Sequence, residues 1–156
     1  MRLCSYLDDR LGERVAVVDG DRGLPLSGLH PDSPRTMQEL LDGGDDALSA
    51  IRESADPERI QRDGRLLAEM ALLAPVPRPR KVVAIGRNYR EHAAEEGAEQ
   101  PSVPLIFAKF ASSVVGPGAD VRWDPGLTGQ VDYEAELAVV IGKRTRAVPV
   151  DTMPDS

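Results

Sequence analysis

Cysteine is scarce in this chain, because Cys4 is the only one in 156 residues. A single thiol excludes an intramolecular disulfide framework and a cysteine-rich zinc site. Long apolar runs are missing as well: no stretch approaches the ~20 residues that a transmembrane helix needs, and residues 1–8 lack the apolar stretch of a signal peptide. We therefore expect a cytoplasmic protein that has no membrane partner.

The sequence also lacks a basic stripe. Its 19 Lys and Arg residues are outnumbered by 26 Asp and Glu residues, which gives a formal net charge of −7. This balance argues against a nucleic-acid partner, whose phosphates need clustered positive charge. With 41% hydrophobic and 29% charged residues, the composition is that of a soluble globular protein, and a small molecule is the expected ligand.

The first 73 residues mix strand and helix signals. Residues 14–18 predict a strand that ends at the turn pair Asp19-Gly20, and residues 1–7 can pair with it. Residues 66–73 fit a helix or a buried strand, and we favour the strand. Three helices are expected, and they start at the capping residues Thr36, Asp46 and Asp56. Thr36 has the spacing of a capping box with Glu39, and Asp56 is followed by Pro57. Residues 1–73 are therefore predicted to form a small α+β domain.

A proline-rich segment separates this domain from the rest of the chain. Residues 74–80 contain Pro75, Pro77 and Pro79, which disfavour a helix and indicate an extended linker. Residues 81–156 are predicted to form mostly β structure with one short helix. We expect strands at residues 81–85, 105–110, 121–123 and 131–141, and a helix capped by Asn88 at residues 90–96.

The sharpest chemical signal lies in the longest of these strands, at Glu134-Ala135-Glu136. Alternate residues of a strand share a face, so Glu134 and Glu136 would lie about 6.7 Å apart on one side. Mg²⁺ suits two such carboxylates, because it takes oxygen ligands and keeps several waters. Alternating acids are also common on a solvated strand face. The apolar run at 137–141 favours metal binding, because a strand buried on both faces would make unpaired carboxylates costly.

A second signal is the pair His92 and Glu95, which are three residues apart on the predicted helix. Side chains at this spacing adjoin, so the carboxylate can orient the imidazole and raise its basicity, as in a general-base pair. A solvent-exposed helix of the same composition is the competing interpretation. His30 has no partner nearby in the sequence, and we assign it no role.

Several ordered blocks of this sequence resemble the fumarylacetoacetate hydrolase family. The blocks are residues 72–75, 81–92, 107–109, 112–113, 116–118 and 132–143. The first 70 or so residues also resemble the small N-terminal domain that bacterial members of this family carry. The resemblance implies an α+β protein in which residues 81–156 form the first, incomplete part of a mixed β-roll with an inserted lid helix.

The resemblance also implies roles for particular residues. In the family the Glu-x-Glu pair, here Glu134 and Glu136, binds Mg²⁺ or Mn²⁺, with Ca²⁺ possible, together with a third carboxylate from a later strand. That Asp has no counterpart here, and the family's catalytic domain continues beyond the position matching Ser156. His92 and Glu95 match the family's base pair, and Lys109 matches a ligand for the substrate carboxylate or enolate. The candidates for substrate binding are Arg87, Asn88, Tyr89, Ser112 and Ser113.

We therefore expect a metal-dependent hydrolase, lyase, decarboxylase or isomerase that acts on a small β-dicarbonyl or 2-oxo acid. Acylpyruvate, fumarylacetoacetate and oxaloacetate-like dicarboxylates all fit, because each reaction passes through a metal-stabilised enolate. Relatives catalyse as homodimers, some in aromatic catabolism, and a homodimer is expected here. The alternative is a non-catalytic truncated fragment or interaction module of the same fold, which the missing carboxylate and the open strand edges favour.

Overall fold

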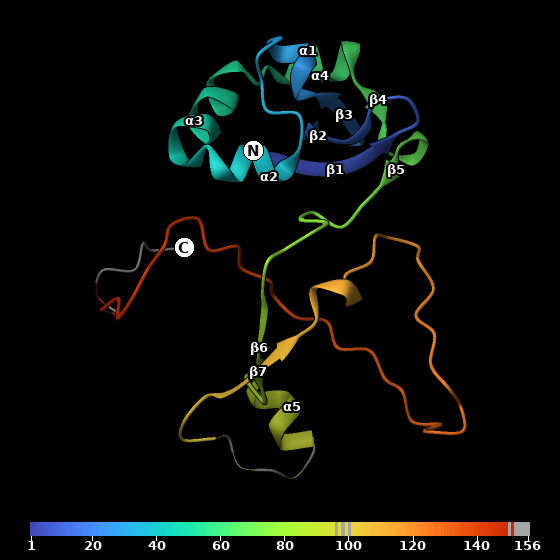
Figure 1. Cartoon of the computed structure of the whole chain (residues 1–156), viewed down its shortest axis with the longest axis vertical. Coiled ribbons are helices and arrows are strands. Elements are labelled where there is room, and N and C mark those ends of the chain that lie inside the picture. The colour runs from blue at the N-terminus through green and yellow to red at the C-terminus, as the bar shows by residue number, and fades with distance from the viewer. Residues whose placement is uncertain (96, 98, 100, 150, 152–156) are drawn as a thin grey trace.

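A computed structural model describes residues 1–95, 97, 99, 101–149 and 151. Figure 1 shows strands β1 to β5 and helices α1 to α4 gathered together, and we call these elements the N-terminal unit. A single extended segment leads from this unit to strands β6 and β7 and helix α5. Within the described residues, no helix is long and apolar enough to cross a membrane.

The N-terminal unit is built on a five-stranded sheet in the order β4-β3-β2-β1-β5. Strands β1 (Arg2–Asp8), β2 (Gly12–Asp19) and β3 (Arg22–Pro25) form an antiparallel meander. The first turn is fixed by Asp8, whose carboxylate accepts hydrogen bonds of 3.0 Å from the amides of Arg10 and Leu11. Both strands predicted at the start of the chain are thus confirmed, together with the turn that separates β2 from β3.

Two of the three predicted helix starts are confirmed. Helix α2 (Met37–Asp42) begins after Thr36, whose hydroxyl accepts the Glu39 amide at 3.2 Å. Helix α4 (Pro57–Asp63) begins after Asp56, whose carboxylate accepts the Glu58 amide at 3.0 Å.

The prediction at Asp46 is wrong. Helix α3 (Gly44–Ser54) starts two residues earlier, so Asp46 lies in its first turn. There its negative charge stabilises the helix by interacting with the positive end of the helix dipole. Gly44 can begin this helix directly after α2 because it adopts a positive φ of 63°. The four-residue helix α1 (Leu26–Leu29) was not predicted.

The main core lies between one face of the sheet and the helices. Val15 and Val17 point from alternate positions of β2 to this face, where they meet Leu26, Leu40 and Ile60. On the other face, Ala16 packs with Tyr6 and Met70 in a smaller cluster. Apolar side chains on both faces of β2 explain its nearly continuous apolar sequence, because the strand is covered on both sides.

The ambiguous stretch at 66–73 forms parts of two strands rather than one. Strand β4 (Arg65–Leu66) and strand β5 (Ala71–Leu72) are the two edges of the sheet, and the single-turn helix η1 (Leu67–Glu69) joins them. The chain therefore crosses from one edge of the sheet to the other within these residues.

The proline-rich linker is attached to the N-terminal unit along most of its length. The Leu73 amide donates to the Ser5 carbonyl at 2.9 Å, and the Ser5 hydroxyl donates to the Pro75 carbonyl at 2.7 Å. Val76 packs against the main core, and Arg78 forms an ion pair with the largely buried Glu13. We call residues 73–78 the anchored strap, because these contacts fix the direction in which the chain leaves the sheet.

Replacing Ser5 by Ala should destabilise this arrangement. Ser5 is completely buried, and its substitution removes the hydroxyl that donates to the carbonyl of the exposed residue Pro75. Water can reach this acceptor, so we expect the free energy of unfolding to fall by about 0.5–1.5 kcal/mol, the usual net value of one hydrogen bond, measured by urea denaturation. Ser27→Ala, at an exposed serine of α1, is the control and should change it by less than about 0.5 kcal/mol. Equal stabilities of the two variants would show that the hydroxyl does not hold the strap.

Beyond the strap, strands β6 (Val82–Gly86) and β7 (Leu105–Lys109) pair antiparallel in a two-stranded sheet. Helix α5 (Arg90–Glu95) lies between them in sequence, and the single-turn helix η2 (Ala111–Ser113) follows β7. The predicted strands at 81–85 and 105–110 and the helix between them are confirmed to within a residue or two, apart from Glu96, which lies outside the described residues. The role of α5 as a lid stays a prediction.

The strands predicted at 121–123 and 131–141 are absent from the structure, where both stretches lack regular secondary structure. Figure 1 shows this part of the chain, orange to red, as a long open trace. The physical reason is the lack of a pairing strand, because an extended segment gains a ladder of hydrogen bonds only beside a neighbour. Leu137, Val139 and Ile141 are more than 70% exposed, so the apolar run also lacks a covering layer.

Candidate functional site

The turn between β6 and α5 places the first group of predicted site residues. Gly86 ends β6 opposite Leu105, and Arg87 has a positive φ of 53°, which is uncommon for a residue with a side chain. Helix α5 then begins, with the Ala93 amide donating to the Tyr89 carbonyl at 3.1 Å. Tyr89 therefore occupies the capping position that the sequence assigned to Asn88. The shift arises because the left-handed residue at 87 completes the turn before the helix.

His92 and Glu95 both belong to α5. Their backbones lie one helical turn apart, as predicted, but their side chains are outside the part of the chain that the structure describes. The general-base pair therefore stays a prediction. Ala93, which lies between them in sequence, is 2% exposed.

Lys109 is the last residue of β7 and pairs with Val82 of β6. Its ammonium nitrogen lies 5.9 Å from the centre of the Phe107 ring, two residues earlier on the same face of the strand. This distance is within the range of a cation–π contact. Lys109 is exposed, so its charge is available to an anionic group at this end of the hairpin.

The two serines after β7 differ in what their surroundings provide. The Ser113 hydroxyl donates to the Phe110 carbonyl at 2.7 Å within η2. This local hydrogen bond stabilises the turn and uses the proton that a nucleophile would lose. Ser112 is exposed beside it, and a role in substrate binding stays a prediction for both residues.

Glu134 and Glu136 are exposed in the irregular segment that was predicted as a strand. A hydrogen bond joins this segment to the residue before α5: the Leu137 amide donates to the Tyr89 phenol oxygen at 2.8 Å. The turn before α5 and the residue after Glu136 are therefore brought together across 48 positions of sequence. No local pattern predicts this contact, because neither residue type by itself specifies such a partner.

The carboxylates of this segment are suitable ligands for a hard divalent cation, but the described residues do not form a complete metal site. Glu134 and Glu136 supply carboxylate oxygens, and Mg²⁺ commonly binds through one or two carboxylates with water and substrate oxygens. The neighbouring Asp132 carboxylate instead accepts the Tyr133 amide at 2.7 Å. Among the described residues, no three His, Cys, Asp or Glu side chains form a group that could hold a metal.

Gly116 is a further residue that the sequence did not assign to a structural contact. A Cβ atom at this position would lie 3.0 Å from the Leu72 carbonyl oxygen and 3.2 Å from the Leu73 Cα. The segment after η2 thus packs its backbone directly on the end of edge strand β5. Only glycine fits without displacing this backbone, which explains the glycine in the block at 116–118.

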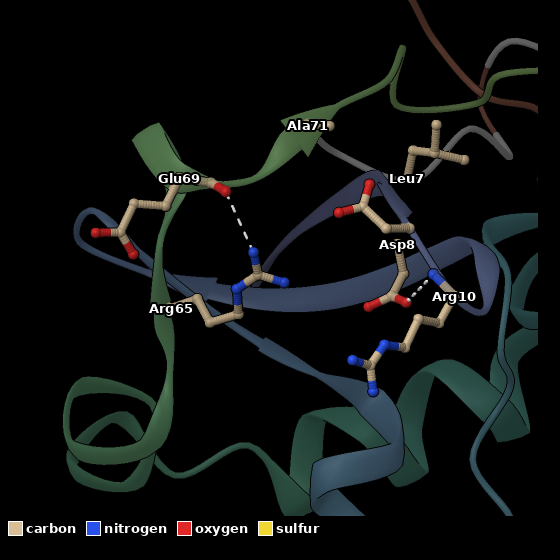
Figure 2. Close-up of a pocket in the computed structure, with 7 residues that line it drawn as sticks. Leu7, Asp8, Arg10, Arg65, Glu69 and Ala71 are labelled. Atoms are coloured by element: carbon tan, nitrogen blue, oxygen red, sulfur yellow. Dashed lines mark hydrogen bonds between the residues drawn. The ribbon is translucent and has the colours of Figure 1, made fainter.

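A pocket of about 200 Å³ lies elsewhere, on the N-terminal unit, and Figure 2 shows it. Asp8 and Arg65 line it from the end of β1 and from β4, and Arg65 donates to the Glu69 carbonyl at 3.2 Å. The two amides bound to Asp8 hold the pKa of its carboxyl below the usual value. None of the predicted site residues lines this pocket.

The sequence matches the family model described as Fumarylacetoacetate (FAA) hydrolase C-terminal over residues 81–155. This range contains β6, α5, β7 and the Glu134–Glu136 segment. The chain belongs to the fumarylacetoacetate hydrolase family, as the ordered blocks of the sequence indicated.

Individual relatives extend the match into the N-terminal unit. Oxaloacetate tautomerase FAHD2A, a mitochondrial protein of Bos taurus, is 38% identical over 151 residues, which cover 95% of this chain and 47% of the relative. Oxaloacetate tautomerase YisK of Bacillus subtilis is 40% identical over 118 residues, covering 70% of this chain and 39% of the relative. The chain thus spans about half the length, or less, of these curated relatives.

A solved structure supports the same fold. An HpcE-type protein from Mycobacterium smegmatis superimposes with a TM-score of 0.54 and 30% sequence identity, covering 79% of this chain and 41% of that protein. Together with the mixture of helices and strands, this similarity confirms the α+β class.

Proposed function

We propose that this chain is part of an enzyme that interconverts the keto and enol forms of a small 2-oxo dicarboxylic acid such as oxaloacetate. The observation that carries the proposal is the identity of 38–40% with two proteins named oxaloacetate tautomerase, one from an animal and one from a bacterium. Isomerisation is preferred over hydrolysis or decarboxylation on this ground alone, because the chemistry of the site residues serves all three reactions.

The reaction moves one proton and breaks no carbon–carbon bond. In the proposed mechanism, the imidazole of His92 removes a proton from the carbon next to the keto group, and the electron pair of that C–H bond forms the enolate. The imidazolium of His92 then donates this proton to the former keto oxygen, which completes the enol. Glu95, one turn along α5, stabilises the imidazolium and keeps the imidazole oriented between the two transfers.

The remaining residues bind and neutralise the substrate. The ammonium group of Lys109, exposed at the end of β7, pairs with a substrate carboxylate or with the enolate oxygen. Arg87 and the backbone amides near Gly86 receive the second carboxylate at the start of α5. A divalent cation held by Glu134 and Glu136 would supply Lewis-acid stabilisation of the negative charge on the enolate oxygen.

The metal-binding part of the proposal is tested by removing one carboxylate charge. In the whole protein, Glu136→Gln should raise the dissociation constant for Mn²⁺ at least about tenfold, because a neutral amide is a weaker ligand for a hard cation. Isothermal titration calorimetry measures this constant directly. Glu99→Gln, at an exposed loop position, is the charge-matched control, and equal Mn²⁺ affinities of the two variants would contradict the site.

A further inference from the structure

We propose that Tyr89 is a positioning residue, which holds the Glu134–Glu136 segment against the start of helix α5 through its phenol oxygen. The inference rests on the proposed function, because it concerns how the two parts of that site are joined. It also changes the expectation for Tyr89, which the sequence had placed among the substrate-binding residues.

The contact lies next to the second carboxylate. The Leu137 amide, which donates to the Tyr89 oxygen at 2.8 Å, belongs to the peptide group that joins Glu136 to Leu137. Peptide groups are planar, so holding this N–H also fixes the carbonyl carbon of Glu136. The hydrogen bond therefore restricts the backbone rotation of Glu136, and through it the direction in which the carboxylate leaves the chain.

The other end of the contact is attached to the helix. The Tyr89 carbonyl accepts the Ala93 amide at 3.1 Å, and Ala93 is buried. Tyr89 also lies three residues before His92, so their positions are neighbours on one helical turn. The contact therefore joins the start of α5, the helix that carries the proposed base, to the backbone beside Glu136.

The chemistry of the phenol suits this role. Its oxygen accepts the amide while its own O–H remains able to donate. Leu137 is 82% exposed and its segment has no strand neighbour in the described structure, so the tyrosine replaces the ladder partner that this amide would have in a sheet. Phenylalanine at position 89 would keep the ring and remove only this acceptor.

The test compares Tyr89→Phe with Tyr133→Phe in the whole protein. Tyr133 is 90% exposed and lies beside Glu134, so the control removes the same hydroxyl from the same neighbourhood. Amide hydrogen exchange followed by NMR is the first measurement. We expect Tyr89→Phe to accelerate exchange at Leu137 about threefold or more, and to leave exchange unchanged at Gln130, whose amide donates to the Thr128 hydroxyl at 3.1 Å.

Two further readouts separate positioning from substrate contact. Tyr89→Phe should weaken Mn²⁺ binding in the absence of substrate by about threefold to tenfold, while Tyr133→Phe leaves it unchanged. At saturating Mn²⁺ the KM for oxaloacetate should stay within about twofold of the wild-type value and kcat should fall. An increase in KM with unchanged Mn²⁺ affinity would overturn the inference in favour of a substrate contact.

The outcomes also distinguish this inference from the proposed function. If Glu136→Gln weakens Mn²⁺ binding and Tyr89→Phe does not, the positioning role is wrong and the metal site stands. If neither variant changes Mn²⁺ binding, the proposed metal site fails, and the positioning role fails with it. Unchanged exchange at Leu137 in Tyr89→Phe overturns the inference whatever the metal does, because the hydrogen bond is then absent in solution.

Discussion

Turnover of oxaloacetate should fall by a factor of about 10² to 10⁴ when His92 is replaced by Asn, because a positioned general base contributes that much to a proton transfer. Asn keeps the polarity and approximate size of the side chain but cannot accept and return the proton. The measurement is kcat for keto–enol interconversion in the whole protein, followed by the ultraviolet absorbance of the enol. His30→Asn is the control and should leave kcat unchanged, because His30 is exposed at the end of α1 in the N-terminal unit.

The same experiment tests whether His92 and Glu95 act as one unit. Glu95→Gln alone should lower kcat. The variant with both substitutions should have nearly the same kcat as His92→Asn, because Glu95 acts only by orienting His92. Losses that multiply in the double variant would show that the two residues act independently. A kcat for His92→Asn equal to that of the wild type would remove His92 from the mechanism altogether.

The second large effect is expected in the core of the N-terminal unit, where Leu40→Ala should reduce the free energy of unfolding by about 2–5 kcal/mol. Leu40 is completely buried on α2, among the valines of β2 and the isoleucines of α3 and α4. Truncation leaves a cavity that these side chains, held by three helices and a sheet, can fill only in part. Urea denaturation followed by circular dichroism measures the loss.

The control for this prediction is Leu11→Ala, since Leu11 is 62% exposed in the turn between β1 and β2. The same number of carbon atoms is removed there without opening a cavity, and the change should stay below about 0.5 kcal/mol. A small effect at Leu40 would mean that α2 is not packed on the sheet as the structure shows.

Sequence patterns predicted the N-terminal unit well because its structure follows from local chemistry. The strand at β2 is a run of β-branched and small apolar residues before an Asp-Gly turn, and Thr36 and Asp56 cap their helices through side chains within three residues. Asp46 was misread because a glycine with positive φ can start a helix as soon as the previous one ends. That conformation depends on packing, which the local sequence does not specify.

The candidate site was predicted less completely, for a different reason. Residue types and spacing made the pair on α5 and the Glu pair candidates, and the resemblance to the family added Lys109; the range of the family match contains all of them. Their relative positions depend on contacts between residues far apart in the chain, such as Tyr89 with Leu137. The pattern of alternating acids in an apolar run indicates a strand only where a neighbouring strand is present, and the described chain offers none to residues 131–141.

The anchored strap also has a consequence for the order in which the protein folds during synthesis. Ser5 closes its hydrogen bond with Pro75 and Glu13 its ion pair with Arg78, over 70 and 65 positions of sequence. The sheet can therefore begin to assemble as soon as β3 has left the ribosome, yet its last contacts must wait until Arg78 emerges. Because domains fold largely as units from the N-terminus during translation, the ribosome would release β6 and α5 next to an N-terminal unit that has just been completed.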